Sequence, residues 1–140
     1  MKTILLFLTL SLTTFLLNAQ TESDSSGTTI TVTVPVNSTE GSVLFALEDE
    51  ATFMKKGLQN VDAKIIDGKA TAIFKNVQSG TYGIILFHDK NGNKSMDFEP
   101  NGMPLESYGV SNYIMSFGPP QWSDAKFEVG NEPIEIEIRM

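Results

Sequence analysis

The sequence contains no cysteine and only one histidine, His88, among its 140 residues. No disulfide can form, so stability must come from a hydrophobic core or a bound metal. Transition metals usually need several His or Cys ligands, which this chain cannot supply. No G-x-S-x-G motif accompanies His88, so the sequence predicts no enzyme. The position of His88 in an alternating apolar segment instead predicts a partly buried structural residue.

Positive charge is also scarce, because 17 acidic residues face 10 Lys and Arg, for a net charge of −7. Nucleic acids and anionic membranes attract basic proteins, so neither is an expected partner. The long apolar run lies at the N-terminus, in residues 3–17, between Lys2 and the small Ala19. It is shorter than the ~20 residues of a membrane span and is typical of a secretory signal peptide. We expect residues 1–19 to be removed as a signal peptide by cleavage after Ala19. The mature chain should then contain no membrane span and be exported to the periplasm or medium.

The remaining chain is predicted to form a polar, flexible leader over residues 20–27 and one domain over residues 28–140. Apolar residues alternate with polar ones in seven short segments, the pattern of half-buried strands. These segments are 30–34, 43–47, 63–65, 70–74, 82–88, 126–129 and 134–138. Asp67-Gly68 is a hairpin signal. The pattern predicts an all-β fold, a seven-stranded antiparallel sandwich of immunoglobulin-like or prealbumin-like type.

Two stretches break the alternation. Residues 48–57 begin acidic and end basic, as the helix dipole prefers, and are predicted to form one or two helical turns. Residues 90–121 are long and rich in Gly, Pro, Asn and aromatic side chains. Structureless loops of this length are usually functional or disordered, and the aromatics argue against disorder. We therefore expect any function to lie in this long loop.

The start of the long loop resembles a calcium-binding turn, because oxygen-bearing side chains occur at every second residue. These residues are Asp89, Asn91, Asn93, Ser95 and Asp97. They match the first, third, fifth and ninth positions of an EF-hand loop, with Ser95 expected to supply its backbone carbonyl. Lys94 stands where the loop usually has Gly, and Pro100 where it usually has Glu. The sequence predicts a weak calcium site, with a solvated turn at Asn91-Gly92 as the alternative.

A second pattern combines aromatic and polar residues later in the long loop. Glu106, Tyr108, Asn112 and Tyr113 are able to stack on and hydrogen-bond a sugar, which favours a cell-envelope carbohydrate partner. A protein of the cell envelope is the other expected class of partner. The alternative is that the tyrosines plug one end of the sandwich, while Glu106, Ser111 and Asn112 tie the loop to the backbone.

Three segments in order resemble a known bacterial family. They read F-K-N-V-Q-S-G-T-Y-G-I from Phe74, F-H-D-K-N-G-N from Phe87 and G-M-P-L-E-S-Y-G-V-S-N from Gly102. In this combination they are similar to the bacterial domain of unknown function family 2141, found in exported proteins. The resemblance implies an exported all-β domain and no known activity. The family usually has Gly where this chain has Lys94.

These observations together predict an exported, non-catalytic binding or structural module in which calcium orders residues 89–97. A carbohydrate- or cell-wall-binding module that uses Tyr108 and Tyr113 is the alternative hypothesis. An unidentified enzyme is the third hypothesis. It comes after the other two because no nucleophile and base can be paired in the sequence.

Overall fold

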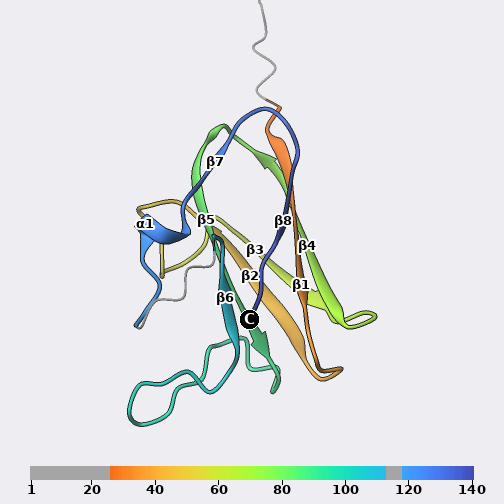
Figure 1. Cartoon of the computed structure of the whole chain (residues 1–140), viewed down its shortest axis with the longest axis vertical. Helices are drawn as coiled ribbons and strands as arrows, with labels where there is room; N and C mark the ends of the chain where they lie inside the picture. The colour runs from red at the N-terminus through yellow and green to blue at the C-terminus, as the bar shows by residue number, and fades with distance from the viewer. Residues whose placement is uncertain (1–25, 113–117) are drawn as a thin grey trace, which may run out of the picture.

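The computed structural model describes residues 26–112 and 118–140, and Figure 1 shows their arrangement. The predicted signal peptide and nearly all of the predicted leader lie outside the described residues. In chain order the elements are β1 (Thr28–Pro35), β2 (Ser42–Glu48), β3 (Gln59–Lys64), β4 (Lys69–Val77), β5 (Gly80–Asp89), β6 (Tyr108–Val110), α1 (Trp122–Ala125), β7 (Phe127–Val129) and β8 (Ile134–Glu137).

The strands form two packed sheets, which confirms the predicted β-sandwich. One sheet has three strands in the order β4-β1-β8. The other has five, in the order β3-β2-β5-β6, with β7 also paired to β5. Each of the seven predicted segments contributes to a strand, and β6 is an additional strand inside the predicted long loop. The immunoglobulin-like or prealbumin-like class of the sandwich stays a prediction.

One strand pair corrects the predicted all-antiparallel arrangement. β8 runs parallel to β1, with Ile30 opposite Ile134 and Val32 opposite Ile136. The chain leaves β7 in one sheet and crosses to the other before β8 begins. Alternation determines which face of a strand is buried, but it carries no information on the direction of the neighbouring strand. The sequence pattern was therefore insufficient to identify this parallel pair.

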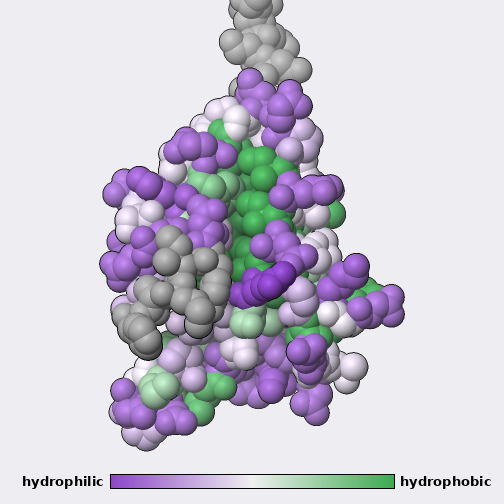
Figure 2. Space-filling view, viewed as in Figure 1, coloured by the Kyte–Doolittle hydropathy of each residue, from purple (hydrophilic) through white to green (hydrophobic). Residues whose placement is uncertain are grey.

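The core lies between the sheets and is built from the predicted alternating residues. It is centred on fully buried side chains of both sheets, among them Ile30, Phe45, Phe74 and Leu86. In the last segment the isoleucines face inward, with Ile138 2% exposed, and both glutamates of β8 are exposed. Figure 2 shows apolar side chains in a band along the middle of one face, beside β8. The predicted register of this strand is confirmed.

The predicted helix over residues 48–57 is wrong, whereas the predicted hairpin is confirmed. β2 continues through Glu48, which pairs with Gly83 of β5, and turns follow up to β3. Strand pairing across the sheet thus overrides the weak helical signal of this acidic-to-basic segment. Asp67 and Gly68 take φ values of 51° and 73°, the left-handed geometry that a tight hairpin turn requires. No helix among the described residues is long and apolar enough to cross a membrane.

Candidate functional site: a pocket on the outer face of the larger sheet

The face of the five-stranded sheet that points away from the core is largely apolar. Strand register places two rows of side chains side by side on this face. The rows are Asp62-Leu44-Phe87-Tyr108 and Asn60-Ala46-Ile85-Val110. The members from β2, β5 and β6 are half-buried. An antiparallel sheet normally presents polar side chains on such a face, so these two rows need a cover.

One end of this face is already covered by an aromatic pair. Phe53 and Trp122 meet edge to face with ring centroids 5.4 Å apart. They lie over Gly83 of β5, where a Cβ atom would be 3.2 Å from the Trp122 ring and 3.4 Å from the Phe53 ring. A side chain at this position would displace the two rings by a few tenths of an ångström, so glycine favours this close approach. Strand β5 carries apolar side chains on both faces, and this outer cover and the floor beside it account for those on the outer face.

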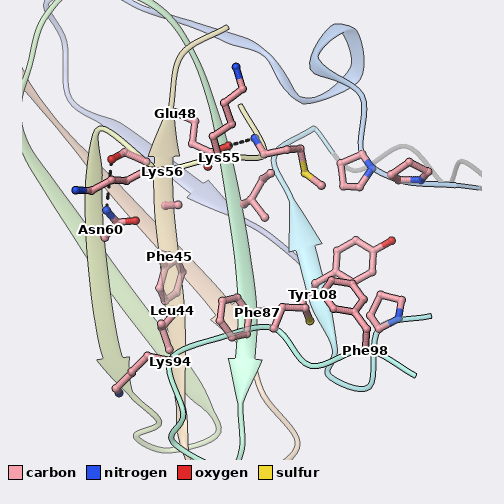
Figure 3. A pocket seen from close by; sticks show the side chains of 18 of the residues that line it. Leu44, Phe45, Glu48, Lys55, Lys56, Asn60, Phe87, Lys94, Phe98 and Tyr108 are labelled. Carbon is pink, nitrogen blue, oxygen red and sulfur yellow. Dashed lines mark hydrogen bonds between the residues drawn. The ribbon is translucent and has the colours of Figure 1, made fainter. Parts of the chain in front are cut away.

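Three loops wall the rest of the outer face and leave a pocket of about 1060 Å³. The walls come from residues 54–57 after β2, from residues 94–104 between β5 and β6, and from residues 118–120 before α1. The floor is provided by Leu44, Ala46, Ile85 and Phe87. Figure 3 shows Leu44 and Phe87 on the floor, with Phe98 and Tyr108 at one side.

The rim of the pocket exposes large apolar side chains. Met54, Phe98 and Met103 are 53%, 58% and 61% exposed, and all three line the pocket. Met96 lines it as well. Methionine adapts to irregular apolar shapes, and exposed apolar patches of this kind mark interaction sites. Sequence reasoning selected Tyr108 and noted the aromatic side chains of the long loop, to which Phe98 belongs, but it did not find the floor that they border.

A buried carboxylate holds the loop that carries Met54. Glu48 is 2% exposed, and its Oε2 accepts a hydrogen bond of 2.9 Å from the Met54 backbone N–H. Burial raises the pKa of Glu48, and the hydrogen bond from Met54 partly opposes this rise. Met54 itself has a φ of 60°, which is uncommon for a bulky residue. The Glu48 contact thus secures a strained turn at the rim of the pocket.

Three lysines and two acids line the pocket: Lys55, Lys56, Lys94, Glu48 and Asp62. Lys94 forms an ion pair with Asp62 on β3, so it connects the loop after β5 to the edge of the sheet. The hydrogen bond between them lowers the pKa of Asp62 and raises that of Lys94. Lys55 Nζ donates to the Ala51 carbonyl at 2.9 Å. Both Lys55 and Lys56 are exposed.

The predicted calcium loop is held together by its own side chains. Asp89 is completely buried, with its Oδ1 accepting from Gly92 N at 2.8 Å and its Oδ2 from Lys94 N at 3.0 Å. Lys94 takes a φ of 62°, consistent with the usual Gly at this position. The Asp89 carboxylate therefore sets the course of the turn that brings Lys94 to Asp62.

The other predicted ligands lie close to one another on the exposed side of the turn. Asp97 accepts hydrogen bonds from the Asn91 amide at 2.6 Å and from the Asn93 amide at 3.0 Å. The amide oxygens of Asn91 and Asn93 accept from the backbone N–H groups of Asn93 and Ser95. Among the described residues, no three His, Cys, Asp or Glu side chains are grouped as metal ligands. Calcium binding by this loop stays a prediction.

The residues of the predicted sugar site mostly contact the protein backbone. The Glu106 carboxylate accepts from Lys90 N at 3.1 Å and from Asp97 N at 3.3 Å, so it joins the two arms of the loop. Asn112 donates to the Lys126 carbonyl at 2.6 Å. Tyr108 lines the pocket, and Tyr113 lies outside the described residues. These contacts correspond to the alternative in which the polar residues tie the loop down.

Two further buried polar side chains stabilise the scaffold around the pocket. Ser111 Oγ donates to the Ala125 carbonyl at 2.5 Å and accepts from Ile84 N at 2.9 Å, which fixes α1 against β5. His88 is 3% exposed on the core side of β5, and its Nε2 is 2.7 Å from the Glu40 carbonyl oxygen. The histidine is more deeply buried than predicted and has a backbone partner, as a structural histidine should.

Residues 30–137 match the bacterial family described as "Uncharacterized protein conserved in bacteria (DUF2141)". The match covers most of the chain, so the protein belongs to this family. Neither the curated proteins nor the solved structures contain a match. The three sequence segments that resemble the family contribute β4 and β5, the turn after β5, and β6 with its preceding loop. The second segment reaches the pocket through Phe87 and the third through Met103, Pro104 and Tyr108, whereas the first contains none of the lining residues.

Proposed function

We propose that the protein is an exported, non-catalytic binding module that holds an apolar ligand in the pocket on its five-stranded sheet. The observation that carries this proposal is the pocket itself, with about 1060 Å³ of space over an apolar floor. Small-molecule sites are typically clefts of about 300–1000 Å³ lined mainly by apolar side chains with a few polar groups. The pocket has both properties.

The way the pocket is built also supports binding. Its rim uses a strained turn at Met54 that a buried glutamate secures, and strained backbone is concentrated at functional sites. Its second wall is anchored by Asp89 and by the Lys94–Asp62 ion pair. The effect of these anchors is to keep exposed apolar residues such as Phe98 near an apolar floor.

Calcium at residues 89–97 is a second part of the proposal. The donor set of carboxylates and amide oxygens within one turn suits a hard cation. The Asn91 and Asn93 amides would have to rotate, because their oxygens now accept from the backbone and their N–H groups face Asp97. This rearrangement makes weak affinity the expected case, about 0.1–1 mM as in extracellular modules. By ordering this turn, calcium would stiffen one wall of the pocket.

A fluorescent apolar probe tests the binding site directly. N-phenyl-1-naphthylamine is neutral and brightens in apolar surroundings, so saturable enhancement with the mature protein is expected. Ile85→Asp places a charge on the floor and should abolish the enhancement. Ile73→Asp is the matched control, because Ile73 is an outward, 49% exposed isoleucine on the three-stranded sheet. It should leave probe binding unchanged.

A second variant distinguishes loss of the binding site from unfolding of the Ile85→Asp protein. Ala46→Trp fills the floor without adding charge, and it should also reduce the enhancement while the far-ultraviolet spectrum stays that of a β protein. Absence of saturable enhancement in the wild type would refute the binding site. Equal loss in Ile73→Asp and Ile85→Asp would refute the assignment to this face.

A further inference from the structure

The pocket differs in polarity between its two ends. Figure 3 shows Lys55 and Lys56 at the end opposite Phe98 and Tyr108, with Leu44 and Phe87 on the floor nearer the aromatic residues. The aromatic end is lined by Phe98, Met103 and Pro104 from the loop between β5 and β6. A ligand that spans the pocket therefore meets apolar groups at one end, and at the other it meets two lysines whose side chains extend outward from the pocket.

The charge at the lysine end is opposite in sign to the net charge of the whole protein. Among the charged residues that line the pocket, three lysines face two carboxylates, which leaves one net positive charge, whereas the full chain carries −7. Lys94 and Asp62 neutralise each other in an ion pair. The Glu48 carboxylate is buried and engaged by the Met54 N–H. Among the charged residues that line the pocket, Lys55 and Lys56 therefore have one carboxylate besides the Lys94 partner, and that carboxylate is already hydrogen-bonded.

Both lysines remain accessible to a ligand. Their residues are exposed, and the contact of Lys55 with the Ala51 carbonyl uses one of the three N–H donors of an ammonium group. Lysine stems lie along apolar surface while the charged group reaches water. An anionic group at this end gains a charge-assisted hydrogen bond while the attached apolar chain covers the floor.

We infer that the pocket takes a monomeric, single-chain amphipathic anion, with its apolar chain over Leu44, Ile85 and Phe87 and its head group at Lys55 and Lys56. This inference rests on the proposed binding function and adds the ligand class. Neutral apolar molecules of the same length contact the apolar floor but gain no interaction with the lysines. Cationic amphiphiles meet repulsion from the lysines. The expected order of affinity is therefore anion, neutral molecule, cation.

Displacement of N-phenyl-1-naphthylamine from the wild-type protein tests this order. Dodecanoate, dodecanol and dodecyltrimethylammonium share one chain length and are added below the concentration at which they form micelles. Dodecanoate should displace the probe at about tenfold lower concentration than dodecanol, the gain from one charge-assisted hydrogen bond. Equal displacement by all three would overturn the head-group assignment, although probe binding itself would stand.

Matched lysine variants locate the head group. Lys55→Gln with Lys56→Gln should bring dodecanoate to the level of dodecanol and leave probe affinity unchanged. Lys69→Gln with Lys75→Gln removes the same charge from β4, outside the pocket, and should preserve the tenfold preference. A preference lost equally in both double variants would point to net charge alone and overturn the inference.

Sedimentation with vesicles separates a free amphiphile from a membrane surface. The wild type is mixed with phosphatidylcholine vesicles that contain phosphatidylglycerol, and no co-sedimentation is expected from this acidic chain. Co-sedimentation that depends on Lys55 and Lys56, without displacement of the probe by dodecanoate, would overturn the inference in favour of a membrane surface. Absence of probe binding in the wild type would instead refute the proposed function from which the inference starts.

Discussion

The outer faces of the two sheets differ in polarity. On the three-stranded sheet, β1 presents threonines between Thr71 and Ile73 of β4 and Glu135 and Glu137 of β8. On the five-stranded sheet the corresponding rows hold Leu44, Ala46, Ile85 and Phe87. A sheet with one face on the core and one in water should alternate apolar and polar residues. The smaller sheet follows this rule, and the larger sheet breaks it where loops form a pocket.

The two faces also differ in what covers them. The smaller sheet needs no cover, whereas the larger one has the Phe53–Trp122 pair over Gly83 and a wall anchored by Asp89. Loops over a sheet are stable only if their backbone groups are hydrogen-bonded. Buried acids supply those bonds: Glu48 to Met54, Asp89 to Gly92 and Lys94, and Glu106 to Lys90 and Asp97. The acids of this region are thus mainly loop anchors.

The largest expected effect comes from removing the anchor of the pocket wall. Asp89→Ala leaves two backbone N–H groups without their carboxylate, so it should lower the free energy of unfolding by about 3 kcal/mol. Chemical denaturation measures this change. Glu132→Ala, which removes an exposed carboxylate in the turn before β8, is the control and should cost no more than about 0.5 kcal/mol. Equal costs would mean that the wall is not anchored as described.

The next effect concerns calcium at the same turn. At one hundred times the dissociation constant, calcium bound to the folded state alone adds about 2.7 kcal/mol, so it should raise the melting temperature by several degrees. Asp97→Ala removes a proposed ligand but keeps the Asp89 anchor. It should eliminate the calcium-dependent rise, as measured by melts with calcium and with chelator. A rise of the same size in this variant would rule out the site.

A smaller effect depends on pH and on the carboxylate buried at the pocket rim. The pKa of Glu48 is raised in the folded state, so folding takes up a proton between the usual value of 4.5 and the raised one. The Glu48 contribution therefore makes the protein less stable as pH rises through that window. Glu48→Gln keeps an oxygen for the Met54 N–H and removes the charge. Its melting temperature relative to wild type should increase from pH 4 to pH 7, and a constant difference would contradict this cause.

The smallest effect is expected at the position that departs from the usual calcium loop. Lys94→Gly relieves a left-handed residue, a gain of about 1–2 kcal/mol, but it adds glycine flexibility that costs about 0.5–1 kcal/mol. It also removes an exposed ion pair, which is worth about 0–1 kcal/mol. The net change in stability should stay within about 1 kcal/mol by chemical denaturation. A larger loss of stability would show that the Lys94–Asp62 ion pair contributes more to the free energy of unfolding than an exposed ion pair usually does.

Local sequence was sufficient wherever a residue's role follows from its immediate neighbours. Ile134, Ile136 and Ile138 alternate with charged residues, so their inward orientation could be predicted. Asp67-Gly68 specifies its own turn because the left-handed geometry is local. The helix predicted over residues 48–57 is wrong because contacts beyond the local charge pattern determine the conformation of this segment. These contacts are the pairing of Glu48 with Gly83 and the Glu48–Met54 hydrogen bond. Those partners are distant in sequence or depend on burial.

The sequence by itself determined the alternating strands and their inward faces, because periodicity and turn chemistry act over a few residues. The tertiary structure alone decided that β8 runs parallel to β1 and that the outer residues of β2, β5 and β6 form one floor. It also decided that Lys94 reaches Asp62 and that Phe98 and Met54 border the same space. Leu44, Phe87 and Tyr108 are isolated residues in the sequence, and strand register makes them neighbours. A binding surface made from several strands exists only after those strands have paired.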